Sequence, residues 1–278
     1  MGYGWTESQL KRLIELGAKD LDKDIEFETK EARDAEYKKN NSQLVNRAKD
    51  ELNKYRNEIR RPALEVLKEK LAEKLTEAGF IQVSTPIILS KKLLYKMTID
   101  DEHPLSKQVF WLDNNKCMRP MLAPNLYYVS KDLMRIWNNP IGIFEIGSCF
   151  RKESEGGNHL AEFTMINVVE WGTELDKRTE RLKEMARMIL DTAEIKDYEF
   201  IEEESVVYGD TVDVMCGDTE LASGSMGPHF LDKAWEINSS WVGIGFGLER
   251  LLMIREGKQN IHSLAKSLSY VGGTRINL

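Results

Sequence analysis

The sequence predicts an α+β fold in which an antiparallel β-sheet is flanked by helices. Strand patterns occur in runs, whereas helical patterns gather near the N-terminus and in one insertion. Two long strand candidates, residues 141–150 and 162–171, are joined by a loop with adjacent glycines. A glycine loop of this kind is typical of antiparallel neighbours, and strands that do not alternate with helices do not favour a parallel sheet.

The composition describes an ordinary globular chain of 278 residues, long enough for one large domain with a small appendage. No apolar run approaches the roughly 20 residues that a membrane span needs, and no secretion signal begins the chain. Three isolated cysteines, Cys117, Cys149 and Cys216, form no CxxC pair. We therefore expect no membrane partner, no disulfide framework and no zinc site, and we expect a reducing, cytoplasmic setting.

Charge is distributed unevenly along the chain. The net charge of −7 argues against nonspecific coating of nucleic acid. Residues 38–61 nevertheless carry eight basic and three acidic side chains, and residues 198–220 carry eight acidic ones with no Lys or Arg. The first segment suits a polyanion and the second suits cations.

The N-terminal 61 residues are predicted to be a helical segment. Thr6 and Gln9 form a capping box, and Gly17 ends the short helix that follows. Residues 24–61 read as charged helices with a break near Asn40 and Asn41. Their thin apolar stripe leaves two interpretations open: a solvated helical hairpin, or a contact with an RNA backbone.

The remaining elements follow in order from residue 62. Pro62 opens an amphipathic helix that ends at Gly79, and a short strand over residues 80–86 comes next; together they weakly suggest a dimer interface. A hairpin is expected over residues 109–122, and Pro124 opens another helix. After the two long strands, an insertion at about 173–197 holds a charged helix, and strands are expected at 199–203, 211–215 and 219–224.

A glycine-rich strand runs directly into a helix near the C-terminal end. Gly243, Gly245 and Gly247 remove side chains along one face of this strand, and Arg250 lies in the first turn of the helix. Bare backbone of this kind accommodates either tight packing or a flat ligand. A cation at a helix N-terminus opposes the helix dipole and needs an anionic or aromatic partner.

A second group of residues suits a nucleotide. Arg151 and Glu153 leave one long strand, and Phe163 begins the strand that returns. An arginine can neutralise phosphate, an aromatic ring can stack on a base, and a carboxylate can accept from an exocyclic amine. Each also has a plainer interpretation, as a surface ion pair or a core side chain. Glu220 and Ser223 offer hard oxygen ligands suited to Mg²⁺, and no P-loop sequence is present.

Taken together, these motifs resemble those of class II aminoacyl-tRNA synthetases. The resemblance rests on Thr85-Pro86, on the FRKE turn at 150–153 with Phe163, and on GFGLER at 245–250. It narrows to the pyrrolysyl-tRNA synthetase family through RPMLAPNLY at 119–127, KES at 152–154, EFTM at 162–165 and VYGDT at 207–211. It covers residues 60–278 strongly, and it looks like the separate catalytic chain of that family, without an additional N-terminal tRNA-binding domain.

The resemblance implies a fold, a domain division and a set of site residues. Residues 62–278 would form the class II catalytic domain, and residues 1–61 would face tRNA. The implied catalytic residues are Arg151, Arg250 and Glu220, and Mg²⁺ would be held by Glu220 and Ser223. The implied ATP-binding residues are Arg151, Glu153, His159, Leu160, Phe163, Glu220, Leu221, Ser223, Gly247 and Arg250. The implied amino-acid-binding residues are Ala123, Leu126, Tyr127, Ser130, Asn167, Val169, Tyr208, Ser225, Trp241, Gly243 and Gly245.

The implied activity is ATP-dependent activation of pyrrolysine or a related lysine derivative, followed by transfer to a cognate tRNA. A homodimer and a separate tRNA-binding protein are implied as partners. Ser130, Ser225 and Ile244 depart from the family pattern, and we expect broader acceptance of bulky lysine derivatives as a result. Two alternatives remain: a related class II enzyme for another amino acid, such as a phenylalanyl-like one, and a synthetase-like tRNA-binding protein without charging activity.

Overall fold

The computed structural model describes residues 2–18, 21–152, 160–205, 209–258 and 260–278. Two compact units divide the chain. The larger is Leu64–Ile261, and the smaller joins Met1–Ala63 with His262–Leu278. The final residues, which we assigned to the catalytic domain from the sequence, therefore cluster with the N-terminal helices. Among the described residues, no helix is both long and apolar enough to cross a membrane.

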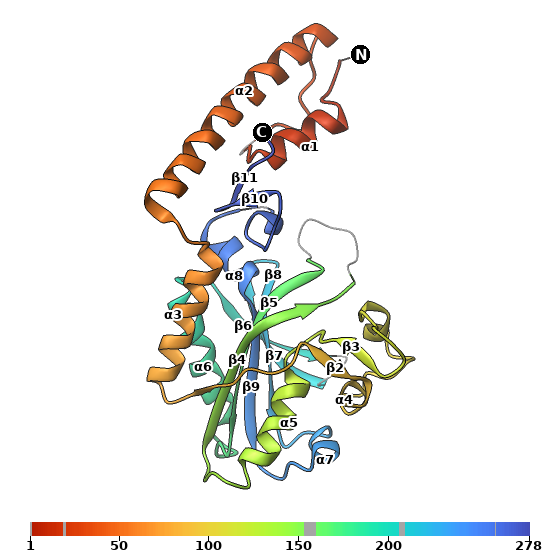
Figure 1. Cartoon of the computed structure of the whole chain (residues 1–278), viewed down its shortest axis with the longest axis vertical. Helices are drawn as coiled ribbons and strands as arrows, with labels where there is room; N and C mark the ends of the chain where they lie inside the picture. Colours follow the sequence, from red (N-terminus) through yellow and green to blue (C-terminus); the bar gives the residue numbers. More distant parts are fainter. Residues whose placement is uncertain (1, 19–20, 153–159, 206–208, 259) are drawn as a thin grey trace. The chain divides into compact units, whose positions relative to one another are not determined.

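A seven-stranded sheet forms the centre of the larger unit, and its neighbouring strands are antiparallel except for the parallel pair β1 and β4 (Figure 1). In spatial order the strands are β1 (Ile81–Gln82), β4 (Ile141–Phe150), β5 (Glu162–Trp171), β9 (Trp241–Gly247), β8 (Thr219–Gly227), β7 (Gly209–Cys216) and β6 (Glu199–Ser205). The predicted α+β class with an antiparallel sheet is confirmed. The limits of β4 and β5 coincide with the predicted ones.

One face of the sheet is covered by α6 (Arg178–Thr192), as Figure 1 shows. A Cβ atom on Gly224 would lie 2.9 Å from Leu182 of this helix. Ile244 pairs with Gly224 in the register and therefore shares its face, where it is buried to 1% exposure. Ile244 thus packs away from the glycine-bare surface, which explains how it is accommodated between the glycines.

A further helix, α3 (Ala63–Glu77), precedes the sheet. Its predicted apolar stripe is confirmed for the four leucines, which are all buried: Leu64, Leu67, Leu71 and Leu75. Ala78, which we also placed in this stripe, is exposed and follows the end of the helix. The helix is followed by Gly79, whose φ of +91° is a conformation that favours glycine. The chain then enters β1, so the predicted order of helix, glycine and short strand is correct.

The opposite face of the sheet carries a hydrophobic cluster built from several short elements. These are β2 (Ile88–Ser90), α4 (Lys91–Tyr95), η2 (Pro104–Gln108), β3 (Lys116–Met118), α5 (Ala123–Leu133) and α7 (Asp232–Trp235). The predicted hairpin over 109–122 is present as a bridge between Trp111 and Cys117. The backbone N–H of Leu112 donates to the Lys116 carbonyl and that of Met118 to the Phe110 carbonyl, each at 2.9 Å, and β3 also pairs with β2. The predicted helix at Pro124 is confirmed as α5.

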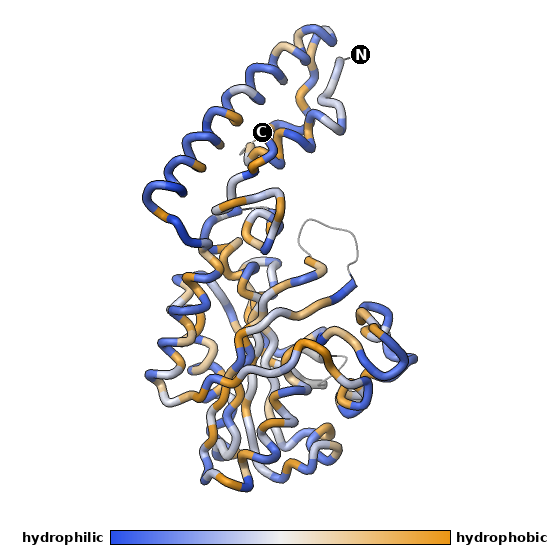
Figure 2. The backbone as a smooth tube through the Cα atoms, viewed as in Figure 1, coloured by the Kyte–Doolittle hydropathy of each residue, from blue (hydrophilic) through white to orange (hydrophobic). Residues whose placement is uncertain are grey.

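The smaller unit contains α1 (Glu7–Glu15), α2 (Lys30–Lys54), η1 (Tyr55–Ile59) and the hairpin of β10 (Tyr270–Val271) and β11 (Thr274–Arg275). The capping box is confirmed, since the backbone N–H of Gln9 donates to Thr6 Oγ1 at 3.2 Å. The break predicted near Asn40 and Asn41 is wrong, because α2 passes through both without interruption. Two asparagines cost too little helix propensity to stop a helix whose neighbours favour it. Figure 2 shows α2 as largely hydrophilic, and Ala48 is its buried residue.

The larger unit also holds α8 (Leu248–Arg255), which continues directly from β9. The last residue of this unit, Ile261, is the first residue of η3 (Ile261–Ser263). The predicted junction of a glycine-rich strand and a helix is therefore confirmed, with Gly247 as the N-cap residue of α8.

Candidate active site

The strand register assembles one row of side chains across the sheet. Glu145 pairs with Asn167, Asn167 with Gly245, Gly245 with Ser223, and Ser223 with Asp213. Paired residues on neighbouring strands share a face, so all five lie on the face opposite α6. Three of them, Asn167, Ser223 and Gly245, are residues that the sequence nominated for substrate binding.

Two neighbouring rows continue this face toward the hydrophobic cluster. Val169 pairs with Gly243 and Gly243 with Ser225, and in the next row Trp171 pairs with Trp241. A Cβ on Gly243 would lie 3.4 Å from the Trp241 ring and 3.5 Å from Val169, which is ordinary contact. The glycines therefore leave a shallow bare strip between the nominated side chains.

The central glycine of the strip is the tightest. A Cβ on Gly245 would lie 3.1 Å from Asn167 Oδ1 and 3.3 Å from the terminal methyl carbon of Met165. Gly245 thus keeps the half-buried amide of Asn167 uncovered on the side that faces the strip. An uncovered amide on an otherwise bare backbone can donate to a ligand carbonyl oxygen.

An aromatic chamber closes one end of this face. Tyr127 from α5 stacks on Trp235 at 5.3 Å and meets Trp171 and Trp241 edge-on at 5.4 and 5.6 Å. Tyr127 and Trp241 are 4% and 3% exposed. These rings pack against one another within the hydrophobic cluster and make this end of the face apolar and aromatic. The sequence had nominated Tyr127 and Trp241, and it missed Trp171 and Trp235, which β5 and α7 bring beside them.

The nominated residues on α5 belong to the same cluster. Leu126 is 2% exposed and Ala123 packs against the cluster. Ser130 is fully buried, and its Oγ has no hydrogen-bond partner in the part of the chain that the structure describes. The same holds for the Oγ of Ser225, which is 6% exposed. Both positions, which we expected from the sequence to depart from the family pattern, place a hydroxyl in an apolar setting where water or a ligand would satisfy it.

A buried carboxylate that the sequence analysis missed lies behind the chamber. Asp232 is 5% exposed, and the Trp241 indole N–H donates to both of its oxygens at 3.0 Å. The Tyr127 hydroxyl is 3.5 Å from the same carboxylate. Burial raises the pKa of Asp232, while the hydrogen bonds from the His229 backbone and from Trp241 lower it. Only the folded chain reveals this contact, because Asp232 and Tyr127 are far apart in sequence.

The other end of the face carries Arg151 and Phe163. The Arg151 guanidinium lies over the Phe163 ring, 5.3 Å from its centroid, and its Nε donates to the Pro120 carbonyl at 2.9 Å. Burial lowers the pKa of Arg151, the charge of Arg250 lowers it further, and Glu220 opposes both. A half-buried cation beside a second cation is a site that an anion would stabilise.

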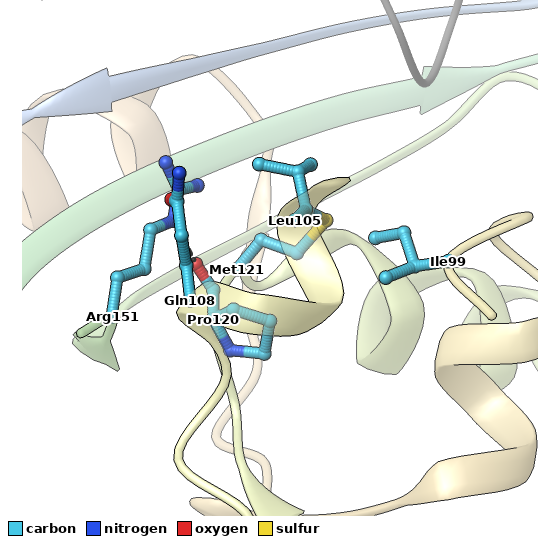
Figure 3. A pocket seen from close by; sticks show the side chains of 6 residues that line it. All are labelled: Ile99, Leu105, Gln108, Pro120, Met121 and Arg151. Atoms are coloured by element: carbon cyan, nitrogen blue, oxygen red, sulfur yellow. Dashed lines mark hydrogen bonds between the residues drawn. The ribbon is translucent and has the colours of Figure 1, made fainter. Parts of the chain in front are cut away.

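A small pocket lies against this arginine (Figure 3). Its lining residues are Ile99, Leu105, Gln108, Pro120, Met121 and Arg151. The backbone N–H of Lys152 donates to the Gln108 carbonyl at 2.6 Å, which holds the chain after β4 against η2. Arg151 is thus held by the Pro120 carbonyl, which accepts from its side chain, and by the backbone hydrogen bond of the next residue, Lys152, to Gln108.

Arg250 and Glu220 are brought together as the sequence suggested. Arg250 Nη1 donates to the Glu220 carbonyl oxygen at 2.5 Å and lies 3.9 Å from Glu220 Oε1. Arg250 is partly exposed, and so is Gly247 one turn earlier. Leu221 beside Glu220 is buried, and Leu160 lies just before β5. The remaining nominated residues, Glu153, His159 and Tyr208, lie outside the described residues.

A second buried network, also missed from the sequence, supports the central row. Arg119 and Glu145 are 3% and 2% exposed and form an ion pair of 2.7 Å. Glu145 also accepts from the backbone N–H and the hydroxyl of Thr85, at 3.0 and 2.6 Å. Asn125 donates to Thr85 Oγ1 at 2.7 Å. The network joins the segment after β1, the start of α5 and β4, and it places Arg119 directly before the Pro120 carbonyl that holds Arg151.

The acidic end of the central row suits a hard cation. Asp213 is 7% exposed, and its Oδ1 has no hydrogen-bond partner among the described residues. It pairs in register with Ser223. Ser223 lies on β8, two strands from Asn167 on β5. Within the described ranges, no three His, Cys, Asp or Glu side chains gather into a metal site. Hard oxygens that need water and substrate phosphates to complete a shell fit Mg²⁺, and they do not fit a metal that needs a full protein cage.

An antiparallel sheet with paired arginines at one end and a glycine strip leading into a helix defines a class II aminoacyl-tRNA synthetase core. The family model described as tRNA synthetases class II core domain (F) matches residues 48–272, and the chain belongs to this class. A crystal structure of pyrrolysyl-tRNA synthetase from Desulfitobacterium hafniense is 54% identical over 100% of both chains, with a TM-score of 0.94. The chain belongs to the pyrrolysyl-tRNA synthetase family.

Other relatives agree with the class. A second structure of a pyrrolysyl-tRNA synthetase from the same organism is 53% identical, with a TM-score of 0.92, over 100% of this chain and 96% of that one. Threonine–tRNA ligase of Wolbachia sp. subsp. Brugia malayi is 28% identical over 165 residues, or 56% of this chain. The chain spans about a quarter of the length of that ligase.

Proposed function

We propose that the chain activates pyrrolysine, or a related lysine derivative, with ATP and transfers it to a cognate tRNA. The observation that carries the proposal is the position of Asn167. Its amide lies at the middle of the glycine strip, between the aromatic chamber and the arginine end. A substrate with a long apolar side chain interrupted by an amide carbonyl matches that order of groups, and phenylalanine has no carbonyl for Asn167.

The arginine end accounts for ATP binding. Arg151 holds the α-phosphate, and Phe163 and Arg250 enclose the adenine between a ring and a guanidinium plane. Glu153 reads the adenine amino group. Gly247, Leu221, Leu160 and His159 complete the surroundings of the nucleotide. The lowered pKa of Arg151 and the approach of two cations favour a polyanionic ligand at this place.

The reaction needs positioning and charge stabilisation more than proton transfer. The substrate carboxylate is already a nucleophile, so no side chain has to act as a base. Arg151 and Arg250 stabilise charge on the α-phosphoryl group as pyrophosphate leaves. The terminal ribose hydroxyl of tRNA then attacks the aminoacyl adenylate.

Mg²⁺ would be held by Glu220 and Ser223, where it neutralises charge on the phosphates. Asp213 pairs in register with Ser223, and its Oδ1, which has no partner within the described part of the chain, supports a cation at this end of the row. The carbonyl oxygen of Glu220 also accepts a hydrogen bond from Arg250. This bond links Glu220, which would hold the metal, to Arg250, which would stack on the adenine.

The aromatic chamber accounts for the amino-acid side chain. Ala123, Leu126, Tyr127, Val169 and Trp241 form its apolar wall, and Gly243 and Gly245 leave room along the strip. Tyr208 would also contact the amino acid. The buried hydroxyls of Ser130 and Ser225 support our expectation that bulky lysine derivatives are accepted more broadly.

The smaller unit supports a tRNA contact. All eight basic side chains of residues 38–61 are exposed: Lys38, Lys39, Arg47, Lys49, Lys54, Arg56, Arg60 and Arg61. Exposed cations on a largely hydrophilic helix suit a phosphate backbone. We further propose a cytoplasmic homodimer through residues 62–86, where Ile81 is 43% exposed, and a separate tRNA-binding protein as a second partner.

The proposal is tested by ATP–pyrophosphate exchange and by charging of the cognate tRNA with pyrrolysine. Arg250→Ala should lower the exchange rate by at least about 100-fold, because it removes a charge-stabilising donor. Arg255→Ala is the matched control, since Arg255 lies on the same helix and is paired with Glu256 at its far end. It should keep about the wild-type rate.

Each outcome distinguishes one alternative. A wild-type chain that exchanges with phenylalanine and not with pyrrolysine would indicate the related class II enzyme for another amino acid. A wild-type chain that binds tRNA without exchange or charging would indicate a tRNA-binding protein and would overturn the proposal.

A further inference from the structure

We infer that Asp232 is a positioning residue that sets the shape of the amino-acid pocket by holding Trp241 and Tyr127. The inference rests on the proposed function, because it assigns the selection of the amino-acid side chain to the chamber these rings form. Asp232 itself lies behind the rings and does not touch the reacting atoms.

Asp232 has contacts with two distant segments of the chain and with a backbone group in its own turn. The Trp241 indole N–H of β9 donates to both oxygens at 3.0 Å, and the Tyr127 hydroxyl of α5 lies at 3.5 Å. The backbone N–H of His229 donates to Oδ2 at 2.7 Å. A carboxylate that is 5% exposed and accepts from three donors is costly to disturb, because any donor left over would be buried without a partner.

The same short helix also supplies an aromatic support. Trp235 stands at the other end of α7 and stacks on Tyr127 with an interplanar angle of 20°. Lys96 Nζ lies 4.9 Å from the centroid of the Trp235 ring. Tyr127 is therefore held by α7 twice, through its hydroxyl and through its ring face, so a displacement of α7 would move a wall of the pocket.

Trp241 is restricted on its other sides by glycines. A Cβ on Gly227 would lie 1.9 Å from the indole nitrogen, so only glycine leaves room for the indole in its present orientation. On the far side of the ring, the strip begins at Gly243, whose Cβ would lie 3.4 Å from Trp241. The bond to Asp232 therefore fixes the direction of the indole N–H, while Gly227 leaves the space that this orientation of the ring occupies.

The test is Asp232→Asn, which keeps the size of the side chain but places an amide N–H₂ against the buried donors of Trp241 and His229. ATP–pyrophosphate exchange is measured with pyrrolysine and with a series of Nε-acyl lysines of increasing acyl size. We expect the KM for pyrrolysine to rise about tenfold, while the KM for ATP stays within about twofold of the wild-type value. We also expect the preference among the acyl sizes to change.

Two further variants complete the experiment. Asp132→Asn makes the same chemical change on an exposed side chain of α5 and should leave both KM values at the wild-type level. Trp241→Phe removes the indole N–H that donates to Asp232. This variant tests the same hydrogen bond if Asp232→Asn does not fold. It should also raise the KM for pyrrolysine, and the double variant should lose less than the sum of the two single changes.

The outcomes separate this inference from the proposed function. If the wild type shows no exchange with pyrrolysine or any Nε-acyl lysine, the proposed function fails and the inference fails with it. If the wild type exchanges normally, and a folded Asp232→Asn keeps both the wild-type KM and the wild-type substrate ranking, the inference alone is overturned. An equal rise in the KM for ATP would also overturn it, because that indicates general destabilisation.

Discussion

The buried pair of Arg119 and Glu145 allows a sharp prediction about stability. Glu145→Gln keeps the shape of the side chain and removes its charge. Arg119, which is 3% exposed, would then lack its anionic partner, although it would still donate to the Ser148 carbonyl at 2.8 Å. The Thr85 hydroxyl and backbone N–H would also compete for one remaining amide oxygen.

The expected loss is large because both charges are out of water. Breaking a buried ion pair by removing one partner costs about 3–5 kcal/mol in the free energy of unfolding. For a unit of this size, that corresponds to a fall in melting temperature of roughly 6 to 20 °C. Thermal unfolding followed by far-UV circular dichroism measures the change.

A matched control uses an ion pair of similar length on the surface. Arg187 and Glu180 are 2.6 Å apart, and their side chains are 43% and 63% exposed. Glu180→Gln should leave the melting temperature unchanged, because water already solvates both groups. Equal melting temperatures for Glu145→Gln and Glu180→Gln would refute the reasoning. Replacing both Arg119 and Glu145 with apolar residues should recover part of the loss, because no buried charge remains.

Two further predictions concern the glycine strip and the thiols. Gly245→Ala should raise the KM for pyrrolysine by about tenfold and leave the KM for ATP unchanged, because the new methyl group would press on the Asn167 amide. In exchange kinetics, a KM for pyrrolysine equal to that of the wild type would contradict this. At pH 8, iodoacetamide should label partly exposed Cys216 at least about tenfold faster than Cys117 or Cys149, as followed by mass spectrometry. Burial raises the pKa of Cys117 to about 11 and that of Cys149 to about 12, so neither thiol forms much thiolate at pH 8. Equal labelling rates for all three cysteines in the native protein would rule this explanation out.

Local patterns predicted the helices and the long strands well. Strand-like runs on either side of a glycine loop located β4 and β5, the capping box located α1, and the amphipathic pattern located α3. These features depend on neighbours within a few residues, so sequence alone carries them. The pairing of β3 with β2 was not predictable, because it depends on a partner more than twenty residues away along the chain.

The chemical types at the site could also be read from the sequence. Arg151, Phe163 and Arg250 were nominated from the sequence, because their residue types suit a nucleotide and the motifs that hold them resemble those of class II synthetases. The row from Glu145 through Asn167 to Asp213 could not be foreseen, because it is set by the register of five strands. A shift of one residue in that register would have turned these side chains to the other face.

By itself, the sequence determined the fold class, the family and the residues that could carry the chemistry. These depend on local periodicity and on motifs whose members lie close together in the chain. Only the tertiary structure decided which buried groups hold those residues in place. Asp232 behind Trp241 and Glu145 beside Arg119 have no local signal, because a buried hydrogen bond between distant segments exists only after the chain has folded.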